Sequence, residues 1–395
     1  MSSSSLSASD PGANVLEQIA EQAQAAGRIA LDTEFMGEGR YRTLLCLIQI
    51  AVADGGGERI EIVDPLEGRL QGEPLAQVLV DPRIEVVVHA GRQDIALLRR
   101  TLGCEVRNVF DTQVAAGFLG MPAQASYDTL LAELLGVRLA KSASFTRWDA
   151  RPLSSEQLSY AREDVVHLTA LAGELEHRLE HAGRLQWARE ECEFLERVND
   201  ERDIDTIFAR LPRVRGMSAA SQNVARELVA WRERTAQERD KPVQSVLGDA
   251  ALVEIAKRKP SNVGKLEEIR GVAQNSLRKR GEELLEAVRQ GLQSAHEPLP
   301  SDRRPAQPRP DDAPLIALCE TLVRARAREA GLAYELLASR ADLQAVVVGQ
   351  RTGERAEVRT LRGWRGELVG KELLDLLDGR LSLSVKDRCV QVSSG

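Results

Sequence analysis

The sequence Arg28-Ile29-Ala30-Leu31-Asp32-Thr33-Glu34-Phe35 carries two acidic residues inside a run that otherwise predicts a short buried strand. Because residues i and i+2 of a strand point to the same face of a sheet, Asp32 and Glu34 should project side by side. Two such carboxylates repel each other unless a cation neutralises them, and their oxygens suit a hard divalent ion such as Mg²⁺ or Mn²⁺. For an Asp-x-Glu pair taken alone, a solvated strand end is the commoner outcome.

Strand and helix patterns on both sides of this stretch predict an α/β domain. Further strands are expected at residues 44–52, 59–63, 85–89 and 106–110. Helices are expected at residues 15–24, 74–80, 92–102, 112–119, 127–135 and 154–179. Three antiparallel strands followed by alternating helices and strands predict a mixed sheet with helices on both of its faces.

The length of 395 residues exceeds what one ordinary core supports, so two or three domains are expected. A hydrophobic share of 43% with 29% charged residues is typical of a globular protein. No apolar run is long enough for a membrane helix and no secretory signal is recognisable, so a cytoplasmic location is expected. The five cysteines are scattered, which predicts buried reduced thiols and no zinc site.

Charge is distributed unevenly along the chain. Residues 210–292 contain 17 Lys and Arg against 11 Asp and Glu, a net charge of +6 within a chain of net charge −7. A basic segment joined to an acidic one is what a nucleic-acid partner would explain, although a solvated helical surface also produces it.

Two more carboxylates fall at informative places. Asp94 follows the strand at residues 85–89 and lies in the first turn of the next helix, where the helix dipole stabilises a negative charge. Tyr160 and Asp164 are four residues apart in a predicted helix and therefore share a face. Each signal is weak alone, because Asp is common at helix starts and a Tyr with an Asp on one face is usually unrelated.

Taken together, the order Asp32-x-Glu34, Asp94, and Tyr160 with Asp164 resembles the DEDD exonuclease superfamily in its tyrosine-containing branch. The resemblance to ribonuclease D is closer still. It rests on residues 31–35, 47–49, 88–91, 110–113, 141–142 and 151–153. It implies that Asp32, Glu34, Asp94 and Asp164 hold two divalent ions, Mg²⁺ or Mn²⁺, and that Tyr160 orients the attacking water.

The later part of the chain resembles HRDC domains, which are helical nucleic-acid-binding modules. The residues that carry this are Pro242, Leu247, Asp249, Leu252, Ile255, Ala256, Pro260, Leu266 and Gly271, and more loosely residues 336–343 and 363–365. The resemblance implies a ribonuclease H-like mixed-sheet exonuclease domain at residues 13–205 and two all-α HRDC-type domains at 206–295 and 313–380. The remaining segments are expected to be a disordered tail at 1–12, a linker at 296–312 and a tail at 381–395.

Substrate contacts are predicted from residue type and position. Phe35 and Met36 could stack on terminal bases, although apolar residues at a strand end are more often core. The candidate phosphate contacts are Arg40, Arg42, Lys141 and Arg147, each of which could equally be an ordinary solvated charge.

The resemblance implies a metal-dependent 3′→5′ exoribonuclease that releases nucleoside 5′-monophosphates from structured RNA such as transfer RNA precursors. Nothing in the sequence indicates a membrane or an obligate protein partner. Two alternatives stay open: a DNA 3′→5′ exonuclease, since the same four acids serve both substrates, and a non-catalytic RNA-binding adaptor. The complete set of acids speaks against the adaptor.

Overall fold

The computed structural model describes residues 11–68, 70–139, 147–272, 274–297, 299 and 307–394, without the side chains of 11–14 and 274–277. The chain divides into two compact units. The first comprises Met1–Glu34, Leu45–Asn199 and Ala306–Gly395, and the second comprises Phe35–Leu44 and Asp200–Pro305. Residues 1–10 of the predicted tail at 1–12 lie outside the described residues, as do residues 298 and 300–306 of the predicted linker at 296–312.

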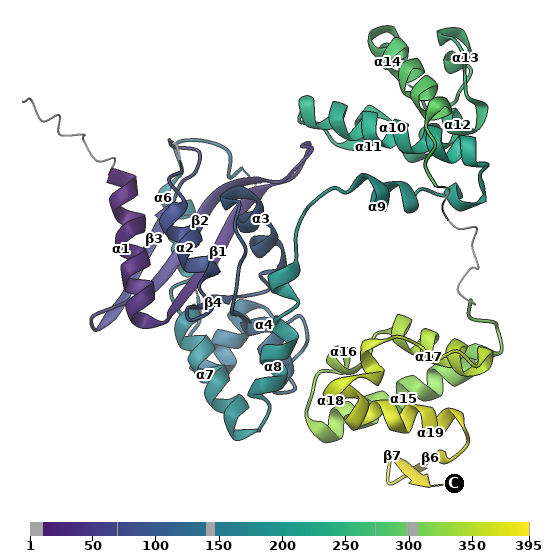
Figure 1. Ribbon diagram of the computed structural model, residues 1–395. Helices are drawn as coiled ribbons and strands as arrows, with labels where there is room; N and C mark the ends of the chain where they lie inside the picture. Colours follow the sequence, from purple (N-terminus) through teal and green to yellow (C-terminus); the bar gives the residue numbers. More distant parts are fainter. Residues whose placement is uncertain are drawn as a thin grey trace, which may run out of the picture. The chain divides into compact units, whose positions relative to one another are not determined.

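A five-stranded mixed sheet forms the centre of the first unit, in the order β3-β2-β1-β4-β5 (Figure 1). Its strands are β1 (Arg28–Met36), β2 (Leu44–Asp54), β3 (Gly57–Val63), β4 (Glu85–Val88) and β5 (Val109–Asp111). Strands β1, β4 and β5 pair in parallel, with Ile29 opposite Val86 and Val86 opposite Val109, whereas β2 and β3 pair antiparallel. The predicted mixed sheet is confirmed. Strand β2 is buried on both faces, which explains its nearly continuous apolar sequence.

Helices cover the sheet on both sides. They are α1 (Pro11–Ala26), α2 (Glu73–Val80), α3 (Arg92–Leu102), α4 (Thr112–Gly117), α5 (Tyr127–Leu130) with a π-helical turn (Leu131–Leu135), α6 (Ser155–Glu163), α7 (Leu168–His181) and α8 (Leu185–Cys192) with a 3₁₀ turn (Leu195–Arg197). On one face, Leu168 and Leu171 of α7 share a core with Ala30, Val87 and Phe110 of the sheet.

The prediction of one helix over residues 154–179 is wrong, because the chain breaks between α6 and α7. Asp164 is the C-cap of α6, and His167 precedes α7. Two consecutive β-branched residues, Val165 and Val166, follow Asp164, and such residues lower helix propensity. The break leaves the carboxylate of Asp164 at a helix end.

The second unit contains a helical bundle. Its helices are α9 (Ile204–Ala209), a 3₁₀ turn (Val214–Gly216), α10 (Ala219–Glu238), α11 (Val243–Val246), α12 (Asp249–Arg258), α13 (Val263–Glu267) and α14 (Gln274–Gln293). Leu228, Leu252 and Val288 belong to its apolar core. Within that core, the buried guanidinium of Arg232 forms an ion pair of 2.5 Å with Asp249, so the charge is not buried without a partner.

The C-terminal part of the first unit is a second all-α bundle that ends in a hairpin. Its elements are α15 (Asp312–Ala330), α16 (Tyr334–Leu337), α17 (Arg340–Thr352), a 3₁₀ turn (Arg359–Leu361), α18 (Gly363–Arg365), a π-helical turn (Gly366–Gly370), α19 (Lys371–Leu377), β6 (Leu381–Lys386) and β7 (Cys389–Ser394). The sequence patterns do not predict the hairpin. It exposes Cys389, so the expectation of buried thiols is wrong there, whereas Cys46, Cys192 and Cys319 are buried.

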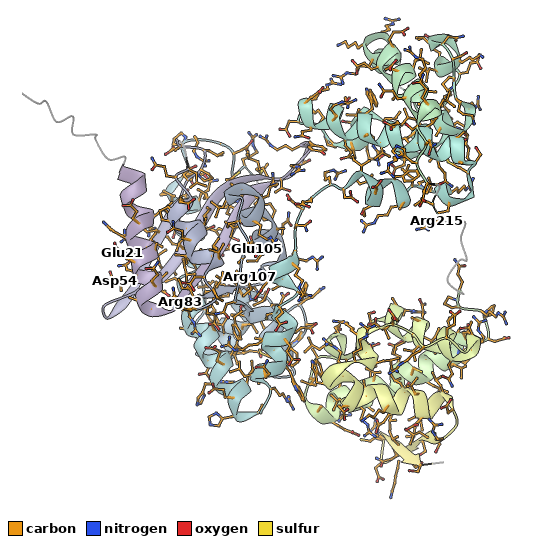
Figure 2. All side chains as sticks on the ribbon, viewed as in Figure 1. Glu21, Asp54, Arg83, Glu105, Arg107 and Arg215 are labelled. Atoms are coloured by element: carbon orange, nitrogen blue, oxygen red, sulfur yellow. The ribbon has the colours of Figure 1, made fainter. Side chains whose placement is uncertain are left out.

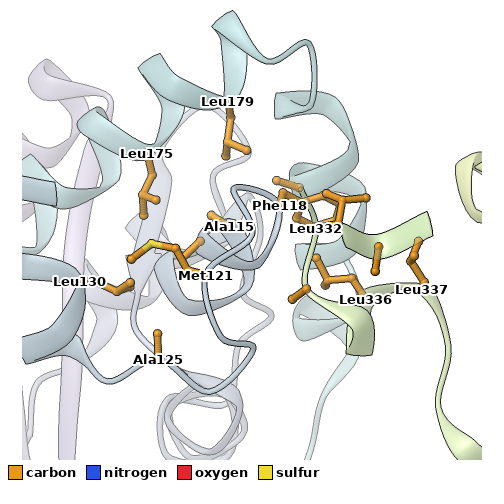
Figure 3. Close-up of a cluster of buried hydrophobic side chains, with 14 of the residues drawn as sticks. Ala115, Phe118, Met121, Ala125, Leu130, Leu175, Leu179, Leu332, Leu336 and Leu337 are labelled. Carbon is orange, nitrogen blue, oxygen red and sulfur yellow. The ribbon is translucent and has the colours of Figure 1, made fainter. Parts of the chain in front are cut away.

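This C-terminal bundle shares one apolar core with the sheet-bearing part of the first unit. Figure 3 shows Phe118 beside Leu332 and Leu336. Trp364 stacks on Trp187 with a ring separation of 5.1 Å and meets the edge of Phe118 at 5.3 Å. The bundle is therefore a structural part of this unit as well as a candidate RNA-binding module.

The surface is rich in charged side chains, and Figure 2 labels several that are exposed, including Glu21, Arg83, Glu105 and Arg107. Most of their ion pairs are local, such as that of Arg83 with Asp81 at 2.6 Å, and contribute little to stability. Within the described ranges, none of the helices combines the length and the apolar character needed to cross a membrane.

Candidate active site

Strand β1 places Asp32 and Glu34 on one face of the sheet, as the sequence predicts. The residues that alternate with them, Leu31 and Thr33, are buried on the opposite face, whereas both carboxylates are only half-buried. Placing acids in a strand that is otherwise buried costs free energy, and a cation would offset that cost.

Asp164 joins this pair from the end of α6. One carboxylate oxygen each from Asp32, Glu34 and Asp164 lie within 4.8 Å of one another. Across the described residues, no other group of three His, Cys, Asp or Glu side chains is arranged in this way. The three ligand atoms come from a strand and from a helix end about 130 residues later, so the fold brings them together.

Asp94 lies in the first turn of α3 and is buried, with 7% of its surface exposed. The hydroxyl group of Thr33 donates a hydrogen bond to its carboxylate. Asp94 is outside the group of three, but its negative charge helps to raise the pKa values of Asp32 and Glu34. Four carboxylates therefore act on one another electrostatically at this edge of the sheet.

A second buried acid fixes the turn that leads to Asp94. Asp111, at the N-cap of α4, accepts hydrogen bonds from the backbone N–H groups of Ala90 and Gly91 at 3.1 and 2.9 Å. Ala90 has a φ of 53°, a left-handed conformation that an L-residue adopts only when its surroundings impose it. Asp111 thus holds the chain in the shape that starts α3 and aims Asp94.

Burial and mutual repulsion raise the pKa values of these carboxyl groups in the absence of a cation. Burial, then the charges of Asp164 and Asp94, raises the pKa of Glu34 to about 8. Burial, then the charges of Glu163 and Asp128, raises the pKa of Asp164 to about 7. Burial raises the pKa of Asp32 well above its ordinary value, and Asp94 is the next cause. A site of this kind gains free energy by binding positive charge.

Tyr160 lies on α6, one helical turn before Asp164, whose backbone N–H donates to the Tyr160 carbonyl at 3.2 Å. Its ring lies 6.0 Å from the buried ring of Trp148. Burial, then the charges of Asp164, Glu34 and Asp32, raises the pKa of the Tyr160 phenol above its ordinary value. The phenol therefore stays protonated at neutral pH and can donate a hydrogen bond near the carboxylates.

The predicted substrate contacts lie in different surroundings. Phe35, Met36, Arg40 and Arg42 belong to the segment Phe35–Leu44 of the second unit, where Arg40 forms an ion pair of 2.7 Å with Asp240. Arg147 forms an exposed ion pair of 3.1 Å with Asp149 in the first unit. Lys141 lies outside the described residues. The substrate roles of all six residues stay predictions.

Sequence reasoning missed two residues that support the site. Thr33 sits between the two acids of β1 and bonds to Asp94, and Trp148 packs beside Tyr160. Strand alternation places Thr33 on the face opposite to the two acids, but its bond to Asp94 depends on the position of α3, which no local pattern shows. Trp148 carries no local signal that points to Tyr160.

Two family models match the chain. The 3′–5′ exonuclease family matches residues 12–180, and the HRDC domain family matches residues 221–288. The ribonuclease D of Gluconacetobacter diazotrophicus is 36% identical over 94% of this chain and 92% of the relative. The ribonuclease D of Granulibacter bethesdensis is 35% identical over 92% of this chain and 91% of the relative.

The chain belongs to the ribonuclease D family. Among solved structures, Escherichia coli RNase D, described as an exoribonuclease involved in structured RNA processing, has a TM-score of 0.76 and 28% identity, covering 93% of this chain and 97% of that one. The catalytic core of RRP6 from Trypanosoma brucei has a TM-score of 0.53 and 27% identity, covering 72% of this chain and 79% of that one.

As a member of this family, the chain is a hydrolytic 3′→5′ exoribonuclease that acts on RNA. Enzymes of the exonuclease family generally depend on divalent metal ions. The donor set here fits such ions, because every candidate ligand is a carboxylate oxygen and three of them already lie within 4.8 Å. One HRDC domain is identified, and the assignment of the C-terminal bundle to the same family stays a prediction.

Proposed function

We propose that this member of the ribonuclease D family shortens the 3′ ends of structured RNA such as transfer RNA precursors and releases nucleoside 5′-monophosphates. In this proposal Asp32, Glu34, Asp94 and Asp164 hold two divalent ions, Mg²⁺ or Mn²⁺, and Tyr160 is the fifth catalytic residue. The observation that carries it is the convergence of carboxylate oxygens from Asp32, Glu34 and Asp164 within 4.8 Å. The raised pKa values of these groups support the need for a cation.

Each residue has a distinct part in the proposed reaction. Bound divalent ions supply Lewis-acid activation of water and stabilise the charge that develops on the leaving 3′-oxygen. The rigid strand β1 fixes Asp32 and Glu34, while Thr33 holds Asp94 against the sheet edge. Tyr160 donates a hydrogen bond that orients the attacking water, since a phenol with a raised pKa is a poor base at neutral pH.

RNA binding beyond the active site is assigned to the basic helical bundle of the second unit. Its residues 210–292 carry a net charge of +6, and exposed cations such as Lys257, Arg278 and Lys279 are suited to phosphate contacts. Such contacts are independent of base sequence, which fits enzymes that act on many RNAs with a single-stranded 3′ tail. A cytoplasmic location stays a prediction.

A matched substrate assay tests the proposal. Purified full-length protein with Mg²⁺ or Mn²⁺ is given labelled RNA and DNA of the same sequence, as single strands and as hairpins with a 3′ tail. We expect stepwise release of 5′-monophosphates from RNA tails, no activity with chelator, and no activity of Asp32→Ala although it binds RNA normally. Equal or faster cleavage of DNA would favour the DNA exonuclease, and RNA binding without cleavage would favour the adaptor.

A further inference from the structure

Gln49, in the middle of β2, is a buried side chain that the fold leaves without a hydrogen-bond partner. None of its surface is exposed. Neither its amide nitrogen nor its amide oxygen has a hydrogen-bond partner among the residues that the structure describes. A buried amide in this condition has lost its hydrogen bonds to water and forms none within the protein, so it destabilises the fold. Such a group calls for a functional explanation.

Gln49 projects from the same face of the sheet as the catalytic acids. Ala51 of β2 and Ala30 of β1 belong to one core cluster, and β1 and β2 are neighbours in the sheet. Because side chains two residues apart share a face, Gln49 lies on the face of Ala51, and Asp32 lies on the face of Ala30. The amide of Gln49 and the carboxylate of Asp32 therefore project from neighbouring strands to one side.

The elements that cover this face also lead to the site. Val165 and Leu168, which flank the break between α6 and α7, belong to the same core cluster as Ala30 and Ala51. Asp164 immediately precedes Val165. The site contains hydrogen-bond acceptors in excess, because an ionised carboxylate has no donor. The amide of Gln49 offers two N–H donors in the same layer, at a position where water has no direct access.

We propose that Gln49 is a positioning residue of the active site, whose amide nitrogen donates to the carboxylate of Asp32, directly or through one buried water, when divalent ions are bound. This inference rests on the proposed function. It gives the orphaned amide its partner in the metal-loaded enzyme, where Asp32 is fully ionised. Groups that orient metal ligands in this way typically change metal affinity by about 10- to 100-fold when they are replaced.

Gln22 provides a matched control. Its amide oxygen is also buried without a partner, and it lies on α1. Gln18 of the same helix accepts from Arg59 of β3 at 3.0 Å, whereas the next residue of β3, Ile60, packs on the core cluster of the other face. Helix α1 therefore covers the face opposite to Gln49. Replacing Gln22 tests the effect of removing a buried amide away from the carboxylates.

The experiment measures Mn²⁺ binding by calorimetry and thermal unfolding with and without Mn²⁺, for the wild type, Gln49→Met and Gln22→Met. We expect Gln49→Met to keep or raise the unfolding temperature without metal and to weaken Mn²⁺ binding by about 10- to 100-fold. Gln22→Met should leave Mn²⁺ affinity unchanged. An unchanged affinity in Gln49→Met would overturn the inference and leave Gln49 as a core residue.

Two further measurements keep the test decisive. If Gln49→Met does not fold, Gln49→Asn retains an amide but withdraws it by one methylene group, and its Mn²⁺ affinity decides in the same way. The wild-type protein separates a failure of the proposed function from a failure of the role of Gln49. If the wild-type protein binds no Mn²⁺, the proposed function fails, whereas tight wild-type binding that Gln49→Met and Gln49→Asn both retain refutes only the role of Gln49.

Discussion

The hydroxyl group of Thr33 on β1 donates a hydrogen bond to the carboxylate of Asp94 at the start of α3. This bond joins two of the elements that carry acids, so it should orient Asp94 toward the ions. We expect Thr33→Val, which keeps the shape and removes the donor, to weaken Mn²⁺ binding by about 10- to 100-fold. Thr33→Ser keeps the hydroxyl and should bind normally. Equal Mn²⁺ affinities of the two variants in calorimetry would remove Thr33 from the site.

The raised pKa of Glu34 makes the metal-free protein sensitive to pH. Because the pKa is about 8 in the folded chain and lower in the unfolded chain, the folded state holds a proton that the unfolded state has lost. The stability contribution of Glu34 is therefore complete at acid pH and is lost as pH rises towards 8. Metal-free Glu34→Gln should unfold at a higher temperature than the wild type at pH 8, by about 2–4 °C for each kcal/mol recovered.

The difference between Glu34→Gln and the wild type should shrink at pH 5, where the wild-type carboxyl is protonated. Thermal unfolding in chelator at both pH values measures it. Adding Mn²⁺ at pH 8 should reverse the order, since a ligand that binds only the folded wild type stabilises it by mass action. A metal-free Glu34→Gln that is less stable than the wild type at pH 8 would show that Glu34 is not strained by its neighbours.

The sequence predicts the positions of those site residues that follow a local helix or strand period. Asp32 and Glu34 are placed by the strand alternation of β1, and Tyr160 and Asp164 by one turn of α6. The position of Asp94 is harder to predict from the sequence, because it depends on the left-handed turn at Ala90 and on the hydrogen bonds that Asp111 accepts from that turn. No local sequence pattern predicts those contacts.

Sequence periodicity does not predict contacts between segments that lie far apart in the chain. Trp364 stacks on Trp187, and the hydroxyl of Tyr41 donates to Glu233 at 3.0 Å within the second unit. Each pair joins segments more than 170 residues apart. Pattern reasoning finds which residues are apolar or charged, but the choice of partner depends on the packing of whole elements.

Tyr160 is expected to contribute to kcat without coordinating the divalent ions. Tyr160→Phe keeps the ring beside Trp148 and removes only the hydroxyl that orients water. We expect kcat to fall by about 100-fold or more, with Mn²⁺ affinity unchanged. Tyr334→Phe, on α16 of the C-terminal bundle, is the control and should be fully active. A kcat for Tyr160→Phe within twofold of wild type would exclude the phenol from the mechanism.

The HRDC domain is expected to bind RNA through phosphates. Lys257→Glu with Lys279→Glu changes two exposed cations of α12 and α14. Transfer RNA affinity should fall, and the slope of log affinity against log salt should decrease by about 0.7–0.9 for each lost phosphate contact. Lys386→Glu with Arg388→Glu at the C-terminal hairpin makes the same change of charge and should have less effect. Identical salt slopes for both double variants would indicate a non-specific effect of net charge.

Crystals of the protein soaked in Mn²⁺ show whether Asp32, Glu34 and Asp164 together bind divalent ions. Anomalous difference density should show Mn²⁺ bonded to carboxylate oxygens of all three residues in the wild type and lost in Asp32→Ala. Strong Mn²⁺ density elsewhere on the chain, with none between these three carboxylates, would show that they do not form the metal site.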